Sequence, residues 1–265
     1  MGGEALKKKV LIALAVVVAL PLLAFGALFA MREPPDGPRV EAESGVVGIE
    51  AGGAYAWVVR TPHGAVLVDA GLDARGAAIL AELTSEGVER DQVQAVLITH
   101  GHPDHYAAAG LFPKAKVLVG PGDLAMIRGD KAHYSTFGKI IGAVMPMPPA
   151  PPAMTELRGD EELEFDGARF KVIATPGHSP GSVMYLYKDM LFTGDSLMRK
   201  KDGVTIAPSL MSEDSERNRA SLRALAPLAF EKIADGHAGV TSGAKAKLAR
   251  FLAGSSAPAG GEARD

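Results

Sequence analysis

The sequence predicts a mixed α/β (α+β) fold in which strands and helices alternate and antiparallel hairpins are mixed in. The chain has 265 residues, of which 47% are apolar, so it can bury a sizeable core and does not have the composition of a disordered chain. Short β-rich runs alternate with longer segments of helical pattern. No repeat of solenoid length is present in the sequence, which argues against a stacked-repeat architecture.

Gly-Gly and Pro-His-Gly turns separate the first β-rich runs. In chain order, the expected strands are 46–49, 55–60, 65–69, 95–99, 115–119, 168–174, 183–187 and 190–193. The expected helices are 73–86 with Asp73 as its cap, one that Pro121 opens, 213–226 and 241–253. Segment 129–156 is too long for an ordinary connection, so we expect either a functional lid or mobile insertion, or a surface loop without a role.

The N-terminal segment has the pattern of a membrane-directed helix. Residues 10–31 carry no charge, and 22 helical residues span roughly 33 Å, about one hydrocarbon core. Three lysines precede this run and acidic residues dominate after it, which predicts a cytoplasmic N-terminus with the rest of the chain outside. Two interpretations remain open: a transmembrane anchor, or a signal peptide cleaved near Ala24-Phe25-Gly26 that leaves the domain secreted or periplasmic.

These patterns divide the chain into three parts. Residues 1–39 are expected to form the anchor or signal segment and a linker, because the prolines and glycine of 34–38 end any helix. Residues 40–253 are expected to form the folded domain. Residues 254–265 have the small and polar composition of a disordered tail.

Two features of the composition exclude whole classes of site. The chain contains no cysteine, which excludes disulfides, thiolate nucleophiles, iron–sulfur clusters and cysteine-ligated zinc. Any metal must therefore be bound through nitrogen and oxygen. The formal net charge of −3 argues against a broad nucleic-acid footprint, so we expect no nucleic-acid partner.

The strongest local signal is a cluster of ligand-type side chains at the end of strand 95–99. Residues 99–105 have the sequence Thr-His-Gly-His-Pro-Asp-His, with three histidines and one aspartate in six positions. Imidazoles crowded into one turn are poorly solvated, and they repel one another when they are charged. A divalent cation removes both problems, so the cluster predicts a metal site.

The same arrangement recurs after later apolar runs. Strand 168–174 leads into a Gly/Pro turn with His178, strand 190–193 leads into Asp195, and the run 230–234 leads into His237. Loops at strand ends are where α/β folds build their sites. We therefore expect these side chains to lie along one edge of the sheet, next to the first cluster.

Taken together, these motifs resemble the metallo-β-lactamase superfamily, the αββα sandwich hydrolases. The matching pieces are Val68-Asp69-Ala70-Gly71, THGHPDH, TPGHSPGS, FTGDS and DGH, in the family's order, over roughly residues 45–253. The resemblance implies an αββα sandwich, with residues 40–253 as a catalytic domain. It also implies a site for two divalent cations, with zinc as the default and manganese or iron also compatible.

The resemblance also assigns the ligands. The implied set is His100, His102 and His178 for the first ion, Asp104, His105 and His237 for the second, and Asp195 as the bridge between them. Asp69 would orient the ligands without binding metal. An aspartate at position 195 resembles the glyoxalase II and lactonase branch, whereas one group of true β-lactamases has a cysteine there.

The implied activity is hydrolysis of a small molecule outside the cytoplasm. A metal-bridging hydroxide would attack an ester, thioester, lactone or amide carbonyl, and Asp104 would orient it and move a proton. Two alternatives stay open: a mononuclear iron oxidoreductase resembling persulfide dioxygenases, and an anchored module whose metal is structural only. The basic residues Arg199, Lys200 and Lys201 form either a solvated loop or a contact for an anionic substrate. The sequence does not indicate an oligomeric state.

Overall fold

A computed structural model describes residues 33–130, 135, 138–139, 142 and 147–254. The chain divides into two compact units, Met1–Pro34 and Pro35–Asp265, and all the elements below belong to the second. The run 10–31, residues 255–265 and most of the central part of segment 129–156 lie outside the described residues. Among the helices that are described, none combines the length and apolarity needed to cross a bilayer.

The first sheet has seven strands whose order in space follows the sequence. They are β1 (Arg39–Glu43), β2 (Val46–Glu50), β3 (Tyr55–Thr61), β4 (Gly64–Val68), β5 (Val93–Ile98), β6 (Lys116–Val119) and β7 (Thr155–Glu156). Strands β1 to β4 pair antiparallel as a meander, and β4 to β7 pair parallel. The antiparallel hairpins that the sequence predicts therefore share one sheet with parallel strands.

The second sheet has six strands in the order β15-β14-β11-β10-β9-β8. They are β8 (Glu162–Phe165), β9 (Ala168–Ala174), β10 (Val183–Tyr187), β11 (Met190–Gly194), β14 (Lys232–Asp235) and β15 (Val240–Ser242). Only the β11–β14 pair of this sheet is parallel. A short hairpin of β12 (Met198–Lys200) and β13 (Gly203–Thr205) follows β11 in the chain.

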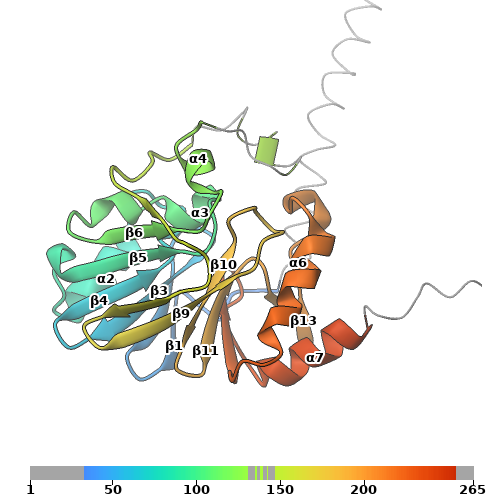
Figure 1. Ribbon diagram of the computed structural model, residues 1–265. Coiled ribbons are helices and arrows are strands. Elements are labelled where there is room, and N and C mark those ends of the chain that lie inside the picture. Colours follow the sequence, from blue (N-terminus) through green and yellow to red (C-terminus); the bar gives the residue numbers. More distant parts are fainter. Residues whose placement is uncertain (1–32, 131–134, 136–137, 140–141, 143–146, 255–265) are drawn as a thin grey trace, which may run out of the picture. The chain divides into compact units, whose positions relative to one another are not determined.

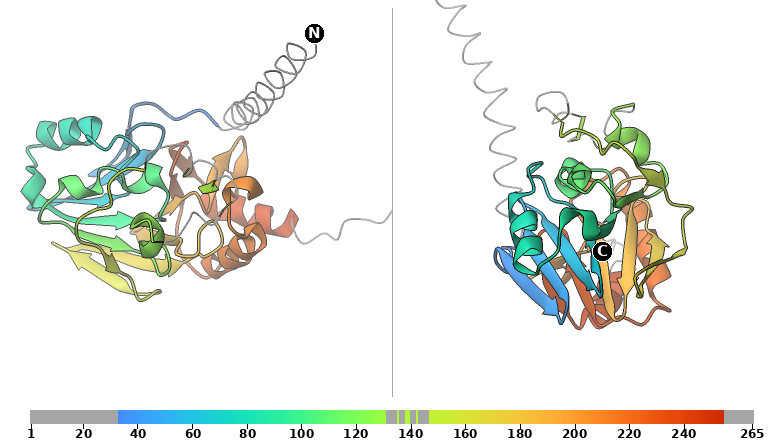
Figure 2. Two further views of the ribbon diagram at one scale, coloured as in Figure 1. Left: turned by 90° about the horizontal axis from the view of Figure 1, so that it is seen from above. Right: turned by 90° about the vertical axis from the view of Figure 1, so that its left-hand side faces the viewer.

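The helices cover the outer faces of the two sheets, as the views in Figures 1 and 2 show. On the first sheet they include α2 (Ala77–Ser85) and α3 (Pro103–Tyr106), and on the second α6 (Ser215–Ser221) and α7 (Ala244–Gly254). Short elements are α4 (Leu124–Ile127) and the 3-10 turns Arg90–Gln92, Ala109–Leu111, Ser209–Met211 and Leu222–Leu225. The expected αββα sandwich is confirmed.

Three buried clusters hold these layers together. One joins α2 to the first sheet, a second lies between the sheets, and a third joins α7 and the 3-10 turn Leu222–Leu225, which continues α6, to the second sheet. Both faces of the first sheet are covered, so its inner strands are apolar on both sides. In β4, Leu67 faces the helices, whereas Val66 and Val68 face the other sheet. Trp57 is the largest side chain between the sheets, and its indole nitrogen donates to the Asp235 carbonyl oxygen.

Several helix boundaries differ from those expected. Helix α2 begins at Ala77 rather than at 73, although the Asp73 carboxylate does accept the Ala77 amide. Pro121 opens no long helix, because a turn leads to the single turn of α4. The helix expected from 213 ends at Ser221 and continues as a 3-10 turn. The helix expected from 241 starts at Ala244, because residues 240–242 pair with β14 instead.

Candidate metal centre

The predicted ligand side chains all follow the ends of buried strands and meet at one edge of the sandwich. Strand β5 leads into His100 and then into helix α3. Strands β9, β11 and β14 of the second sheet end shortly before His178, Asp195 and His237. The overlapping groups that could hold a metal ion are His100-His102-His178, His100-His105-Asp195 and Asp104-His105-His237, with the ligand atoms of each group within 4.8 Å of one another. The structure therefore brings together all seven residues.

Two glycines allow this close approach. Gly194 ends β11 with a φ of +49°, and a Cβ there would collide with Thr99 Oγ1. A Cβ at Gly236 would lie 2.7 Å from Asp195 Oδ1 and from His105 Cε1. Only a residue without a side chain fits at either position, which explains why each glycine lies next to a ligand-type residue in the sequence.

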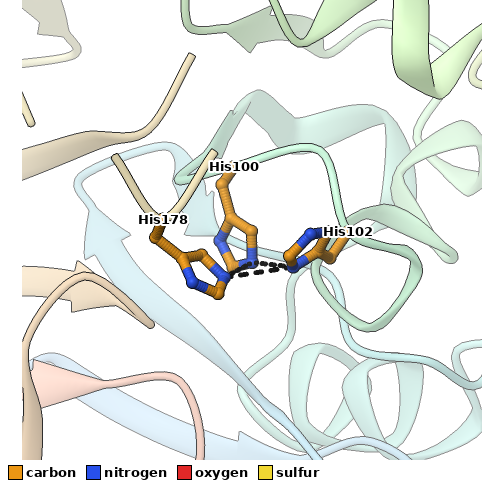
Figure 3. A group of neighbouring side chains, drawn as sticks. All are labelled: His100, His102 and His178. Carbon is orange, nitrogen blue, oxygen red and sulfur yellow. Dashed lines mark hydrogen bonds between the residues drawn. The ribbon is translucent and has the colours of Figure 1, made fainter. Parts of the chain in front are cut away.

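Three imidazole nitrogens of the first group converge on one point (Figure 3). His100 Nε2 lies 3.0 Å from His102 Nδ1 and 3.1 Å from His178 Nε2, and the third side of the triangle measures 3.1 Å. A ring nitrogen is either a donor or an acceptor, so at least two of these three are alike and cannot bond to each other. Protons alone therefore cannot satisfy this triangle.

A cation does satisfy it. Zinc binds imidazole nitrogen at roughly 2.0–2.1 Å, so two nitrogens in a tetrahedral shell lie about 3.3 Å apart. The observed triangle is close to this spacing, and three neutral imidazoles are a common donor set for such an ion. The residues of the first group therefore fit a divalent metal.

Hydrogen bonds on the outer side of the rings fix their orientation. His100 Nδ1 lies 3.1 Å from Thr99 Oγ1, and His178 Nδ1 lies 3.2 Å from Ser212 Oγ. In the second group, His237 Nδ1 donates to the Gly53 carbonyl oxygen at 2.7 Å. In all three histidines, Nε2 is thereby directed toward the centre, as in metal sites whose ligands are held by outer hydrogen bonds.

Asp195 lies between the two groups of ligands. Its Oδ2 is 3.8 Å from His178 Nε2 and 3.2 Å from His237 Nε2, and its Oδ1 is 3.6 Å from His105 Nε2 and 3.1 Å from His237 Nε2. His105 Nε2 and Asp195 Oδ1 are buried and have no hydrogen-bond partner among the described residues. Buried polar atoms without partners are rare, and a cation coordinated by both atoms would satisfy them.

Asp104 and Asp69 lie on opposite sides of the second group. Asp104 Oδ2 is 3.8 Å from His105 Nε2 and 3.6 Å from His237 Nε2, and its side chain is 29% exposed, so it is partly accessible to solvent. Asp69 is buried, and its Oδ2 accepts a 2.7 Å hydrogen bond from His105 Nδ1 on the outer side of that ring. It also accepts from the Thr99 amide and hydroxyl.

Burial and the neighbouring charges set the protonation states. Burial holds the pKa of His100 well below its usual range, and lowers that of His102 to about 3 and that of His178 to about 4. Burial also opposes charge on His105, but the carboxylates of Asp69, Asp104 and Asp195 outweigh it and raise the His105 pKa to about 10. The first group is therefore neutral and ready to bind a cation, while the second carries carboxylates that need positive charge.

We expect the metal-free protein to lose stability in mild acid. An unfolded histidine titrates near pH 6.5, whereas folded His178 does so at about 4, so below pH 6.5 the unfolded chain takes up a proton that the folded protein does not. The neutral His178 ring therefore makes its full contribution to the unfolding free energy above pH 6.5, and about 2.5 kcal/mol of that contribution is lost by pH 4.5. Urea unfolding of chelator-treated protein at pH 7.5 and pH 4.5 measures the loss.

The matched comparison for this test uses two histidine variants. His178→Gln should reduce the loss of unfolding free energy between the two pH values, because the depressed pKa is removed. His63→Gln should leave the loss unchanged, because His63 is exposed on a distant turn, where it pairs with Asp166. An equal pH dependence in the His178→Gln protein and the parent would contradict the expectation.

A further buried residue, which the sequence interpretation missed, joins two of the ligand loops. Asp123 Oδ2 accepts from the Gly101 amide at 2.7 Å and from Ser179 Oγ at 2.5 Å, and its Oδ1 accepts from the Gly181 amide at 2.8 Å. Gly101 separates two ligands, and Ser179 follows His178. Asp123 stands at the start of α4, where an aspartate normally indicates a helix cap, so its position in the sequence carries no separate signal for this role.

Asp123→Asn should weaken metal binding about tenfold while the fold is retained. The amide group of asparagine turns N–H toward a donor, so at least one of the bonds between the two loops is broken. Competition with a chromophoric chelator measures the affinity. Asp160→Asn is the control, because the Asp160 carboxylate accepts one backbone amide, that of Ala174, on the exposed surface. Equal affinities for both variants would refute the role of Asp123.

The three basic residues that follow the FTGDS motif lie on the β12–β13 hairpin and do not share one role. The Arg199 guanidinium bonds to Asp36 and to the Ala238 carbonyl oxygen, so it is engaged with the protein. Lys200 and Lys201 are exposed. For Arg199, the interpretation as a contact for an anionic substrate is therefore replaced by one as an internal ion pair.

Comparisons with known proteins agree with this geometry. The family model described as the metallo-beta-lactamase superfamily matches residues 49–237, which include Asp69 and all seven clustered residues. The chain is 30% identical over 148 residues to a hydroxyacylglutathione hydrolase of Albidiferax ferrireducens, covering 54% of this chain and 47% of that protein. This chain thus spans about half the length of that relative.

Two longer matches extend over most of the folded unit. A probable metallo-hydrolase of Bacillus subtilis, YflN, is 25% identical over 229 residues, with 76% of this chain and 86% of that protein covered. A metallo-beta-lactamase family protein from Thermus thermophilus superposes with a TM-score of 0.65 at 23% identity, covering 80% of each chain. The structural match supports the fold alone.

Proposed function

This chain belongs to the metallo-beta-lactamase superfamily, and from that premise we propose that it is a binuclear metallo-hydrolase acting on a small molecule. Hydrolase relatives of the superfamily support an enzyme. The bond we propose for cleavage is an ester, thioester, lactone or amide. The relative named hydroxyacylglutathione hydrolase supports a carbonyl substrate, although the match covers only part of that protein.

The position of the Asp195 carboxylate is the observation that supports two bound cations rather than one. Its Oδ2 lies between His178 of the first group, at 3.8 Å, and His237 of the second, at 3.2 Å, and its Oδ1 lies 3.6 Å from His105 of the second. We therefore propose His100, His102 and His178 as ligands of the first ion, Asp104, His105 and His237 as ligands of the second, and Asp195 as the bridge. Divalent cations held there would supply Lewis acidity that activates water and stabilises negative charge on a carbonyl oxygen.

The chain's own residues would orient the ligands and transfer the proton. The histidine rings are fixed by outer hydrogen bonds, so the site is preorganised and little reorganisation accompanies the reaction. Partial desolvation opposes charge on Asp104, but neighbouring His105 and His237 outweigh it and lower the Asp104 pKa, so this carboxylate is ionised. Being partly exposed, Asp104 is suited to take the proton of the attacking water and pass it to the leaving group.

We propose zinc as the resident metal, with manganese and iron as compatible substitutes. Nitrogen and carboxylate oxygen donors suit all three ions, and the absence of cysteine removes the softest ligand. Seven retained ligand-type residues also disfavour a module whose metal is only structural.

We further propose that residues 10–31 attach the enzyme to a membrane with the catalytic unit outside the cytoplasm, or direct its secretion if they are cleaved. The support is the uncharged length of this run and the lysines before it. Extraction of membranes with alkaline carbonate, followed by N-terminal sequencing of the mature protein, distinguishes an anchor from a cleaved signal.

The deciding experiment measures metal content and turnover together on the full chain in detergent. A panel of lactone, thioester, phosphoester and β-lactam substrates is tested before and after removal of metal by a chelator. We expect two metal equivalents per chain and hydrolysis that is lost on chelation and restored by zinc. One iron per chain with consumption of oxygen would instead establish an oxidoreductase.

A further inference from the structure

Every backbone amide of the loop that carries His237 has a hydrogen-bond acceptor. Within residues 236–240, the amide of Gly236 donates to the Gly194 carbonyl oxygen, and those of the next three residues donate to Asp235 Oδ1. From strand β3, the Tyr55 amide donates to the Gly236 carbonyl oxygen at 2.8 Å. The last amide, that of Val240, has its partner outside this region of the chain.

That partner is Asp36, in the segment just before β1. Asp36 Oδ2 accepts from the Val240 amide at 2.9 Å, and the Asp36 amide donates to the Ala238 carbonyl oxygen at 3.0 Å. The neighbouring Gly37 is also fixed, because the Tyr55 hydroxyl donates to its carbonyl oxygen at 2.6 Å. Residues 204 positions apart in the sequence thereby complete one loop. The proline-rich segment that the sequence suggests as a linker is therefore hydrogen-bonded to the loop that carries His237.

Arg199 joins the same three parts of the chain. Its guanidinium donates to Asp36 Oδ1 at 2.5 Å and to the carbonyl oxygens of Ala238 at 2.7 Å and Val240 at 3.4 Å. Its backbone amide donates to Asp235 Oδ2 at 2.9 Å. The Arg199 side chain is 18% exposed and that of Asp36 is 31% exposed, so the pair lies at the surface, and the two further bonds of the guanidinium to backbone carbonyl oxygens fix its place there.

We propose that Asp36 and Arg199 are positioning residues for His237 and so set the affinity for one of the two cations. His237 Nδ1 is tied to the Gly53 carbonyl oxygen, so the ring and its backbone are held on two different sides. Without the Asp36 carboxylate, the Val240 amide loses its acceptor. Without the Arg199 guanidinium, the Ala238 carbonyl oxygen keeps the backbone amide of residue 36 and loses its other donor. The loop can then shift while the ring stays tethered, and Nε2 moves away from Asp104 and Asp195. We call the bonds of Asp36 and Arg199 to residues 238–240 the brace. The effect on metal affinity rests on the proposed function, whereas the existence of the brace does not.

The test compares three variants of the full chain with the parent. Asp36→Ala and Arg199→Ala remove the brace, and Arg39→Ala is the matched control. Arg39 makes bonds of 2.9 and 3.0 Å to Glu82, so it also ties the N-terminal part of the folded unit down, but onto α2 and away from His237. Amide hydrogen exchange of residues 236–240 is measured on metal-free protein, and zinc affinity is measured by stepwise competition with a chelator.

We expect exchange at Val240 to rise about tenfold in Asp36→Ala and Arg199→Ala but not in Arg39→Ala. One zinc equivalent should bind about tenfold more weakly, while the affinity of the other is unchanged. Asp36→Asn, which keeps an acceptor oxygen for the Val240 amide, should recover part of the affinity.

Unchanged exchange at Val240 would overturn the proposal. Equal weakening of both zinc equivalents would also overturn it, because that result indicates a general loss of stability rather than positioning of His237. If the parent binds no second zinc ion, the binuclear function fails, and the exchange measurement still decides whether the brace exists.

Discussion

Asp195→Ala should reduce the metal content from two equivalents per chain to one and lower kcat/KM by about 100-fold or more. The variant loses the one carboxylate that reaches both ligand groups, so the second ion retains only Asp104, His105 and His237. Metal analysis after dialysis and steady-state turnover on the substrate found by the panel measure the two effects.

The fold should survive this substitution. Asp195 lies after the end of β11 and contributes no side chain to the three hydrophobic clusters. Far-ultraviolet circular dichroism is therefore expected to match that of the parent. Asp202→Ala is the control, because Asp202 is exposed on the turn of the β12–β13 hairpin. Unchanged metal content and turnover in Asp195→Ala would refute the assignment.

Among the variants proposed here, Asp69→Ala should lose the most unfolding free energy, and it should also lose metal affinity. The carboxylate satisfies three buried donors, namely the Thr99 amide, the Thr99 hydroxyl and His105 Nδ1. Leaving them without a partner costs on the order of 1 kcal/mol each, so we expect the unfolding free energy of the metal-free protein to fall by about 3 kcal/mol. Freed from its outer partner, His105 can rotate, and affinity for one cation should fall about 10- to 100-fold.

Urea unfolding and chelator competition measure these two changes. The comparison variant is Asp73→Ala, which also removes a carboxylate that accepts backbone amides, those of Arg75 and Ala77, but at an exposed helix start. Its cost should stay near about 1 kcal/mol, with unaltered metal binding. If Asp69→Ala unfolds with the same free energy as the parent, the hydrogen bonds of Asp69 do not support the site as described.

The sequence could predict the parts of the fold that burial determines. Strands such as β4 and β5 are continuous apolar runs because both of their faces are covered, and such runs are visible without a structure. Strand β1 alternates charged and apolar residues at the edge of a sheet, and β7 has only two residues. The alternation in β1 spans only five residues, three of them charged, and β7 is shorter still, so hydrogen bonding to a neighbouring strand defines both.

The candidate site likewise has residues that the sequence reveals and residues that only the fold reveals. The seven clustered residues are recognisable because histidines and aspartates recur at strand ends, and the family resemblance built on them is confirmed. Asp123 and Asp36 act through backbone amides that are distant in the sequence, at Gly181 and Val240. No spacing rule connects such pairs, and an aspartate beside glycine or proline is an ordinary turn residue, so only the fold identifies them.

The proposed ligand set is divided between the two sheets, which would give a bound metal a second physical consequence. Residues 100–105 follow strand β5 of the first sheet, whereas His178, Asp195 and His237 follow strands of the second. A bound cation would therefore cross-link the two halves of a chain that has no disulfide. Because it binds only the folded form, free metal at about 100 times its dissociation constant would add about 2.7 kcal/mol to the unfolding free energy. The supply of metal would thus regulate the lifetime of the protein as well as its activity.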